Sequence, residues 1–303
     1  MVRNIDQMGN VVELDALPKR IISLVPSQTE LLYTLGLDDE VIGITKFCIH
    51  PEHWFANKTR IGGTKTINIE KIKSLRPDLV IANKEENVKE QIGALQEFVT
   101  VWLSDVNNLE DALDMIERIG SLTGRNEAAI KLVQQVKQSF EQIGVNAIKN
   151  NGIAQYLPLE NVESIASTDL RQHLYQPIKI AYVIWKNPYM TVGGDTFIGD
   201  MIRRCGFENV FEEQHRYPII ELQELTDLDC RLLLLSSEPF PFTQKHIDAI
   251  QEQLPQVNIL LVDGEMFSWY GSRLVQSASY FKQLITQIQT LINSPVKGFK
   301  LSQ

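Results

Sequence analysis

The side chains in this sequence that are best suited to metal binding lie in one short stretch. Cys48, His50 and His53 form a Cys-x-His-x-x-His pattern, and thiolate and imidazole groups are ligands that zinc and similar transition metals prefer. Pro51 prevents the three side chains from lining one helical face, and the spacing supplies no fourth ligand. A histidine beside the end of an apolar strand is more often a hydrogen-bonded structural residue. We therefore predict that this stretch holds no metal.

A second stretch is similar in outline to a phosphate-binding loop. It reads Val192-Gly-Gly-Asp-Thr-Phe and precedes an expected helix, but a P-loop requires GxxxxGK[ST], which is absent. Asp195 would repel a phosphate, so we expect it to be the N-cap of the helix. Gly193 and Gly194 are expected to form the tight turn between strand and helix.

Catalytic signatures are missing from the sequence. There is no GxSxG, no HExxH, no set of kinase loops, and no GxGxxG after the first apolar strand. A carboxylate pair of the kind that glycosidases use remains an alternative. Its candidates are Glu85, Glu86, Glu238 and Glu265. We predict that the protein is not an enzyme and uses no cofactor.

Aromatic and acidic side chains gather in the segments that follow apolar runs. Aromatic rings offer large, rigid contact surfaces at low entropic cost, which suits a flat or bulky ligand. The alternative is that some of these rings only pack beneath loops or between lobes. The predicted ligand-binding residues are Phe47, Glu85, Trp185, Tyr189, Tyr217, Glu238, Phe240, Trp269 and Tyr270.

The elements that carry these side chains follow a repeated plan. Residues 69–85 and 222–238 each read as a short amphipathic helix, a turn, a run of four apolar residues and a polar loop with a glutamate. Residues 20–36 and 179–206 each read as a strand, a loop, a helix and a closing glycine. Strands that alternate with helices indicate parallel βαβ units, here in two copies.

A helical region separates the two copies. Apolar residues follow helical spacing after Asn108, and a second helix is expected behind Asn126 as its N-cap. We predict an α/β fold of two similar βαβ lobes joined by a long spine helix, with a ligand cleft at the carboxyl ends of both strand sets. The expected parts are an N-terminal lobe (1–107), a helical spine plus an inserted loop (108–177, the loop at 149–177) and a C-terminal lobe (178–303).

Charge and hydropathy exclude several classes of partner. The net charge is −9 and the pI about 5.2, so the chain lacks the basic surface that nucleic-acid binding needs. The longest apolar runs are too short to cross a bilayer, and we expect no direct membrane insertion. Residues 1–20 contain no apolar stretch typical of a signal peptide, so a cytoplasmic location is one expectation. Three widely spaced cysteines do not indicate a disulfide framework.

Several stretches resemble a known family. These are residues 19–32 (KRIISLVPSQTELL), Ile61-Gly-Gly-Thr, residues 68–82, Gly194-Asp-Thr-Phe-Ile, residues 205–211 and Tyr217-Pro. In order and spacing they are similar to the periplasmic binding proteins for cobalamin and ferric siderophores, which serve ABC importers and have a two-lobed, helical-backbone fold. The resemblance covers about residues 19 to 293, apart from the insertion near 149–177. It implies a protein of the periplasm or cell envelope that captures cobalamin, a ferric siderophore or a related metal chelate and passes it to an ABC permease.

The resemblance also assigns roles to individual residues. Glutamates at helix starts, one per lobe, meet permease arginines in this family, and Glu70 falls on the first of these positions. The second position is Gln223, with Glu221 and Glu224 beside it, so Glu70, Gln223 and Glu224 are the predicted docking residues. In the cobalamin-binding branch, tryptophans stand where this chain has Thr64 and Tyr217, which adds Thr64 to the predicted ligand site. The alternatives are a cytoplasmic carrier or sensor without a transporter, and an enzyme that uses the cleft carboxylates.

Overall fold

The computed structural model describes residues 1–151 and 177–293. Most of the predicted insertion at 149–177 lies outside the described residues. No helix in the described part of the chain is long and apolar enough to cross a membrane.

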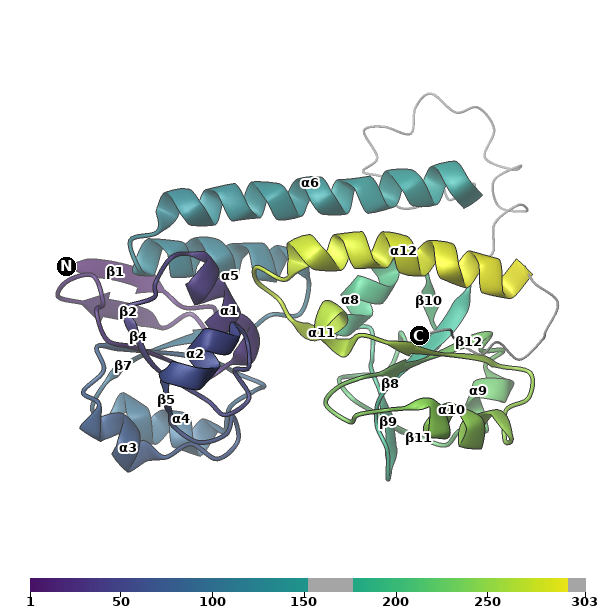
Figure 1. Cartoon of the computed structure of the whole chain (residues 1–303), viewed down its shortest axis with the longest axis horizontal. Helices are drawn as coiled ribbons and strands as arrows, with labels where there is room; N and C mark the ends of the chain where they lie inside the picture. Colours follow the sequence, from purple (N-terminus) through teal and green to yellow (C-terminus); the bar gives the residue numbers. More distant parts are fainter. Residues whose placement is uncertain (152–176, 294–303) are drawn as a thin grey trace. The chain divides into compact units, whose positions relative to one another are not determined.

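The chain forms two compact units (Figure 1). Unit 1 comprises Met1–Lys137 together with Trp269–Val275, and unit 2 comprises Gln138–Ser268 together with Gln276–Gln303. The chain therefore passes from one unit to the other three times. The short segment Trp269–Val275 is far from the rest of unit 1 in sequence, and no local pattern predicts its place there.

Unit 1 contains a five-stranded parallel sheet. Its strand order is β5-β4-β3-β6-β7. The chain starts at the central strand β3, extends the sheet on one side with β4 and β5, and then returns to add β6 and β7 on the other side. The connection therefore reverses between β3 and β6. The strands are β3 (Ile21–Ser23), β4 (Val41–Ile44), β5 (Thr59–Arg60), β6 (Leu79–Asn83) and β7 (Thr100–Ser104).

Helices and a hairpin complete unit 1. All five residues of β6 are buried, as expected for a parallel strand with both faces covered. The hairpin strands pair with each other, and the amide of Gln7 between them donates to the carbonyl of Leu103 on β7. The elements are β1 (Val2–Ile5), β2 (Val11–Leu14), α1 (Pro26–Thr34), α2 (Glu52–Asn57), α3 (Ile69–Ser74), α4 (Lys89–Gln96) and α5 (Leu109–Leu122). Asn108 is the N-cap of α5, with its side chain accepting from the Asp111 amide, which is the expected helix start.

Unit 2 contains a mixed sheet in the order β11-β9-β8-β12-β13, with β10 also paired to β8. Strands β8, β10, β12 and β13 run parallel to one another, whereas β9 pairs antiparallel with both β8 and β11 at one edge. The strands are β8 (Lys179–Trp185), β9 (Tyr189–Thr191), β10 (Glu208–Asn209), β11 (Ile219–Ile220), β12 (Leu232–Ser236) and β13 (Asn258–Val262). The helices are α8 (Phe197–Arg204), α9 (Glu224–Asp227), α10 (Gln244–Gln251), α11 (Gly264–Ser268) and α12 (Leu274–Asn293).

The predicted repeat is present in the backbone of the two units. Strands β6 and β12 occupy the same positions of the aligned segments 69–85 and 222–238, and each lies between two parallel neighbours. The aligned residues Arg76 and Asp229 both have a positive φ, at 48° and 55°. Ile72 and Leu225, also aligned, are both fully buried. The predicted α/β fold is therefore confirmed.

The predicted long helix is also present, as α6 (Asn126–Asn151). It begins at Asn126, so that residue is not the N-cap that we expected. Its residues up to Lys137 belong to unit 1 and the rest to unit 2. Within unit 2 it runs beside α12 (Figure 1), where Phe140 meets Phe281 edge to face and Lys282 donates to Gln142.

The helix start after the glycine pair differs from the prediction. The N-cap of α8 is Thr196, whose side chain accepts from the Gly199 amide, and not Asp195. Asp195 instead accepts a hydrogen bond from the Arg216 amide at 2.7 Å. A Cβ on Gly193 would lie 2.1 Å from the carbonyl oxygen of Gln214. The glycine is therefore required because two backbone segments approach closely here.

Candidate functional site

The connection reversal between β3 and β6 locates a candidate site at the carboxyl ends of the unit 1 strands. Open α/β sheets bind ligands at this kind of position. Its centre is Asn83, the last residue of β6, whose side chain is 3% exposed. The Asn83 Oδ1 accepts from the amides of Glu85 and Glu86 at 2.8 and 3.0 Å. Its Nδ2 donates to Ser104 Oγ at 2.9 Å, so the loop after β6 is tied to the neighbouring strand β7.

A second loop of unit 1 is attached to the first. Asn87 donates to the carbonyl of Thr64 at 3.0 Å, and Lys65 donates to the carbonyl of Glu85. The turn before Thr64 needs Gly62, which has a φ of 111° and would carry a Cβ 2.4 Å from the Thr66 carbonyl oxygen. Thr64 and Glu85, two of the predicted ligand residues, therefore lie on loops that are bonded to each other, and both side chains are half-buried.

The third loop of unit 1 follows β4 and carries Phe47, which is 51% exposed. The Phe47 ring packs over Gly63, where a Cβ would come within 3.1 Å of it. An exposed phenylalanine beside two structured loops provides apolar surface that a ligand can cover.

The Cys-x-His-x-x-His side chains face different partners. Cys48 is fully buried and its sulfur contacts the hydroxyls of Thr29 and Thr45, at 3.0 and 3.1 Å. Burial raises the pKa of the Cys48 thiol. His53 packs edge to face on Tyr33, and His50 packs on Trp269. Within the described residues, no group of three or more His, Cys, Asp or Glu is placed to hold a metal.

Trp269 and Tyr270 belong to unit 1, in the late segment Trp269–Val275. Both are 6% exposed. The Trp269 ring lies between His50, at 5.5 Å, and the guanidinium of Arg273, at 4.6 Å. These two predicted ligand residues thus share a unit with Phe47, Thr64 and Glu85.

Unit 2 builds a similar strand end around Ser236, the last residue of β12. Tyr182 on β8 donates to Ser236 Oγ at 3.1 Å, and Ser236 donates to the carbonyl of Glu238 at 2.5 Å. Burial raises the pKa of Tyr182 far above its ordinary value, so this phenol remains a donor. The Glu238 carboxylate in turn accepts from Ser268 Oγ at 2.6 Å.

Two aromatic groups of unit 2 contain the remaining predicted ligand residues. Trp185 is 40% exposed and meets Phe240 edge to face at 5.7 Å. Phe240 packs in turn on Phe242 at 4.7 Å. Tyr189 on β9 is half-buried, and partial burial raises its pKa. Tyr217 is also half-buried and lies beneath the Arg216 guanidinium at 5.7 Å.

An open hollow of about 550 Å³ lies beside Glu238 in unit 2. Its lining residues are Ser237, Glu238, Leu261, Val262, Asp263 and Glu265. Three of these six residues are acidic, so the hollow favours hydrogen-bond donors over anions. The predictions from sequence included Glu238 but missed Asp263 and Ser237. Ser237 directly follows β12 and Asp263 directly follows β13. Their positions after apolar strands could therefore have predicted both residues from the sequence.

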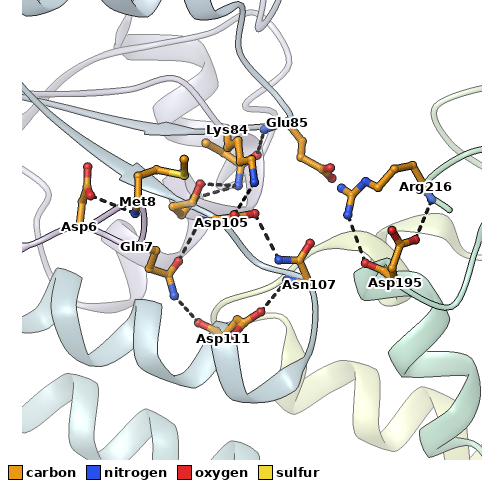
Figure 2. Close-up of polar contacts among 12 residues, drawn as sticks. Asp6, Gln7, Met8, Lys84, Glu85, Asp105, Asn107, Asp111, Asp195 and Arg216 are labelled. Atoms are coloured by element: carbon orange, nitrogen blue, oxygen red, sulfur yellow. Dashed lines mark hydrogen bonds and ion pairs between the residues drawn. The ribbon is translucent and has the colours of Figure 1, made fainter. Parts of the chain in front are cut away.

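Two polar networks surround these loops (Figure 2). In unit 1, Lys84 pairs with Asp105 at 2.6 Å, and the Asp105 amide donates to Gln7 Oε1 at 3.1 Å. In unit 2, Arg216 donates to the carbonyl of Asp195 at 3.1 Å and also binds its carboxylate through the amide. Each network holds a loop that borders a strand end.

The predicted permease-docking residues are exposed at the starts of two short helices. Glu70 is exposed in the first turn of α3, whose N-cap is Asn68. Gln223 is the N-cap of the short helix α9 and is also exposed. The carboxylate of the adjacent Glu224 accepts from the Glu221 amide at 2.6 Å.

A comparison with known protein families matches the first half of the chain. The family described as "Periplasmic binding protein" matches residues 21–153. The matched residues make up most of unit 1 and the start of unit 2 and are similar to this family. The predicted resemblance to this family is therefore confirmed.

Three similar proteins agree with this assignment. A vitamin B12-binding protein of Vibrio cholerae is 24% identical over 209 residues, which cover 68% of this chain and 66% of that protein. The solved structure of a periplasmic vitamin B12-binding protein of Vibrio cholerae has a TM-score of 0.69 at 20% identity, and the match covers 90% of this chain and 98% of the other. An ABC transporter substrate-binding lipoprotein of Bacillus subtilis is 34% identical over 143 residues, 46% of this chain and 45% of its own length. A periplasmic heme-binding protein of Pseudomonas aeruginosa has a TM-score of 0.71 at 18% identity, covering 89% and 93% of the two chains.

The sequence relatives and the solved structures support different kinds of conclusion about this chain. The two sequence relatives are matched over 66% and 45% of their length, so their activities do not transfer directly. The solved structures are less than 25% identical and show the fold alone. The fold that they share with this chain agrees with the predicted α/β fold class.

Proposed function

We propose that this chain is the substrate-binding protein of an ABC-type importer and that it captures a corrinoid or a related metal chelate. The observation that carries this proposal is that each unit ends an inner strand in a loop with a glutamate, Glu85 or Glu238, and each unit also carries an exposed ring, Phe47 or Trp185. The names of the similar proteins, which include vitamin B12-binding and heme-binding proteins, support a flat metal chelate as the ligand.

The proposed ligand contacts combine apolar surface with a few polar groups. Phe47 and Trp185 leave half or nearly half of their surface exposed, and covering aromatic surface is the main source of affinity in such sites. The polar contacts would come from Thr64, Glu85, Tyr189, Tyr217 and Glu238. Phe240, Trp269 and Tyr270 would support the rings or complete the apolar surface. Capture of this kind involves no turnover, and we propose none.

The finer parts of the proposal concern location and partner. We propose that the protein acts outside the cytoplasmic membrane, as the names of the relatives suggest. We also propose that Glu70, Gln223 and Glu224 meet the permease, because all three are exposed at the starts of helices in the two units.

Native mass spectrometry of the purified chain tests the proposed function. The expected result is a ligand of corrinoid or chelate mass that co-purifies with the protein, or binds with one-to-one stoichiometry when cyanocobalamin or hemin is added. A chain that stays in its free form with both probes would contradict the proposal.

A further inference from the structure

Two polar residues occupy equivalent positions in the repeat, and each ends an inner strand of its sheet. Asn83 is the last residue of β6, and Ser236 is the last residue of β12. Strand β6 lies between β3 and β7, and β12 lies between β8 and β13. In each case a glutamate follows two residues later, Glu85 or Glu238. The two strand ends are therefore alike in sequence position and in sheet position.

Each polar residue is hydrogen-bonded to the main chain of its glutamate. Asn83 Oδ1 accepts from the Glu85 amide at 2.8 Å. Ser236 Oγ accepts from the Glu238 amide at 3.3 Å and donates to the Glu238 carbonyl at 2.5 Å. The two side chains differ in chemistry, but they restrain the same residue of the loop.

Neither polar residue can contact a ligand directly. Asn83 is 3% exposed and Ser236 is 1% exposed, and both are anchored on a neighbouring strand, by Ser104 on β7 and by Tyr182 on β8. Buried polar groups that are fully hydrogen-bonded hold their surroundings in one arrangement. Their effect on a ligand must therefore pass through the residues that they hold.

Additional contacts hold the glutamates themselves. The Glu238 carboxylate accepts from Ser268 Oγ at 2.6 Å, and the Glu85 carbonyl accepts from Lys65. Glu85 is held through its main chain and Glu238 also through its carboxylate, and both residues are half-buried, so part of each faces solvent. A half-buried carboxylate accepts hydrogen bonds from N–H groups and repels other anions.

We infer that Asn83 and Ser236 are a repeat-equivalent pair of positioning residues that orient Glu85 and Glu238 as acceptors for N–H groups of the ligand. This inference rests on the proposed function. It specifies a ligand whose edge carries amide groups, such as a corrinoid, in preference to one whose edge carries carboxylates. The acidic hollow beside Glu238 is consistent with the same preference.

Double-mutant cycles on the full chain test the inference, with cyanocobalamin as the amide-bearing probe and hemin as the carboxylate-bearing probe. Ser236→Ala is expected to weaken cyanocobalamin binding about three- to tenfold, which lies in the lower part of the range for coupled neighbours. In a chain that already carries Glu238→Ala, the same change is expected to have no further effect. Asn83→Ala is expected to weaken cyanocobalamin binding to a similar extent. In a chain that already carries Glu85→Ala, Asn83→Ala is expected to have no further effect. Asn83→Asp, which keeps the acceptor for the Glu85 amide, is expected to restore most of the affinity.

Thr191→Val is the matched control. Thr191 is a buried hydroxyl residue in the same sheet as Ser236, and it donates to the carbonyl of Tyr182 without a hydrogen bond to Glu238. Its replacement is expected to lower stability and leave the affinity for cyanocobalamin unchanged. If Ser236→Ala does not fold, Ser268→Ala removes the other hydrogen bond to Glu238 and is subject to the same cycle.

The outcomes separate the inference from the proposed function. If the wild type binds cyanocobalamin but Ser236→Ala weakens it equally with and without Glu238, the inference is overturned and the proposed function stands. If the wild type binds hemin and not cyanocobalamin, the stated ligand preference is wrong and the inference is overturned. A wild type that binds neither probe contradicts the proposed function and the inference together.

Discussion

Arg273 and Glu30 form a bidentate ion pair within unit 1, although 243 residues separate them in sequence. The guanidinium Nε and Nη2 bind the two carboxylate oxygens at 2.9 and 2.7 Å, and the side chains are 8% and 15% exposed. Arg273 also lies over the Trp269 ring. This pair attaches the late segment Trp269–Val275 to helix α1 and so orients a predicted ligand residue.

Arg273→Ala is expected to destabilise unit 1 by about 3–5 kcal/mol, because it leaves the Glu30 carboxylate nearly buried without its charge partner. Urea unfolding followed by circular dichroism measures this change. The matched control is Arg3→Ala, which removes an exposed pair with Glu13 and should cost less than about 1 kcal/mol. Equal effects of the two substitutions would show that the Arg273–Glu30 pair does not anchor the segment.

Replacement of the exposed rings should affect binding more than stability. Trp185→Ala and Phe47→Ala are each expected to weaken ligand binding by about 1–3 kcal/mol, the range for loss of an aromatic anchor. Ile130→Ala is a suitable control, because Ile130 is 51% exposed on α6 and lies outside the predicted site. Titration calorimetry measures all three, and unchanged affinity in both ring variants would remove these rings from the site.

Unit 2 should lose stability in mild acid through His246. This side chain is buried at the start of α10, and its Nδ1 accepts from the Thr243 amide at 2.9 Å. Burial lowers the pKa of His246, and the charges of Lys186 and Lys245 act in the same direction. The unfolded chain therefore takes up this proton at a higher pH than the folded chain does. The contribution to stability is complete above about pH 6.5 and is lost as the pH falls below that value.

His246→Gln tests this dependence, because glutamine at the third helical position can keep the capping hydrogen bond without titrating. We expect the wild type to lose more unfolding free energy than this variant between about pH 7.5 and pH 5.5. His215→Gln, at an exposed histidine, controls for the loss of any imidazole. Parallel pH profiles for the wild type and His246→Gln would show that His246 is not responsible.

Docking to a permease should depend more on unit 1 than on unit 2. Glu70 is an exposed carboxylate, whereas the residue aligned with it, Gln223, carries no charge. Glu70→Ala is therefore expected to weaken complex formation more than Gln223→Ala, with a difference that shrinks as salt is raised. A pull-down with the neighbouring permease in detergent at low and high salt measures this. Equal and salt-independent binding by the two variants would contradict the asymmetry.

The sequence predicts the repeated strand–helix plan because buried parallel strands leave strong apolar runs. Residues 79–83 and 232–236 are examples, and both are strands in which every residue is buried. The N-cap at Asn108 was predictable for a similar reason, since its signal is local.

Other features depend on contacts between residues that are distant in sequence. Asp195 has the residue type of an N-cap, but it binds the Arg216 amide, and Thr196 caps the helix instead. The segment Trp269–Val275 belongs to unit 1, where Arg273 forms an ion pair with Glu30. The two residues are too far apart in sequence for a local pattern to predict this pair. The ligand loops were predicted from strand ends, but the buried residues that hold them, Asn83 and Ser236, were not. Their role is visible only in the hydrogen bonds that they make.

The most direct test of the central claim is a calorimetric titration of the full chain with cyanocobalamin. The account predicts saturable binding at one site, with a negative heat-capacity change from burial of aromatic surface. It also predicts weaker binding by Trp185→Ala and by Glu238→Ala under the same conditions. A titration without saturable heat, by a chain that is folded according to its thermal unfolding and that binds no hemin either, would contradict the claim that this protein captures a corrinoid or a related metal chelate.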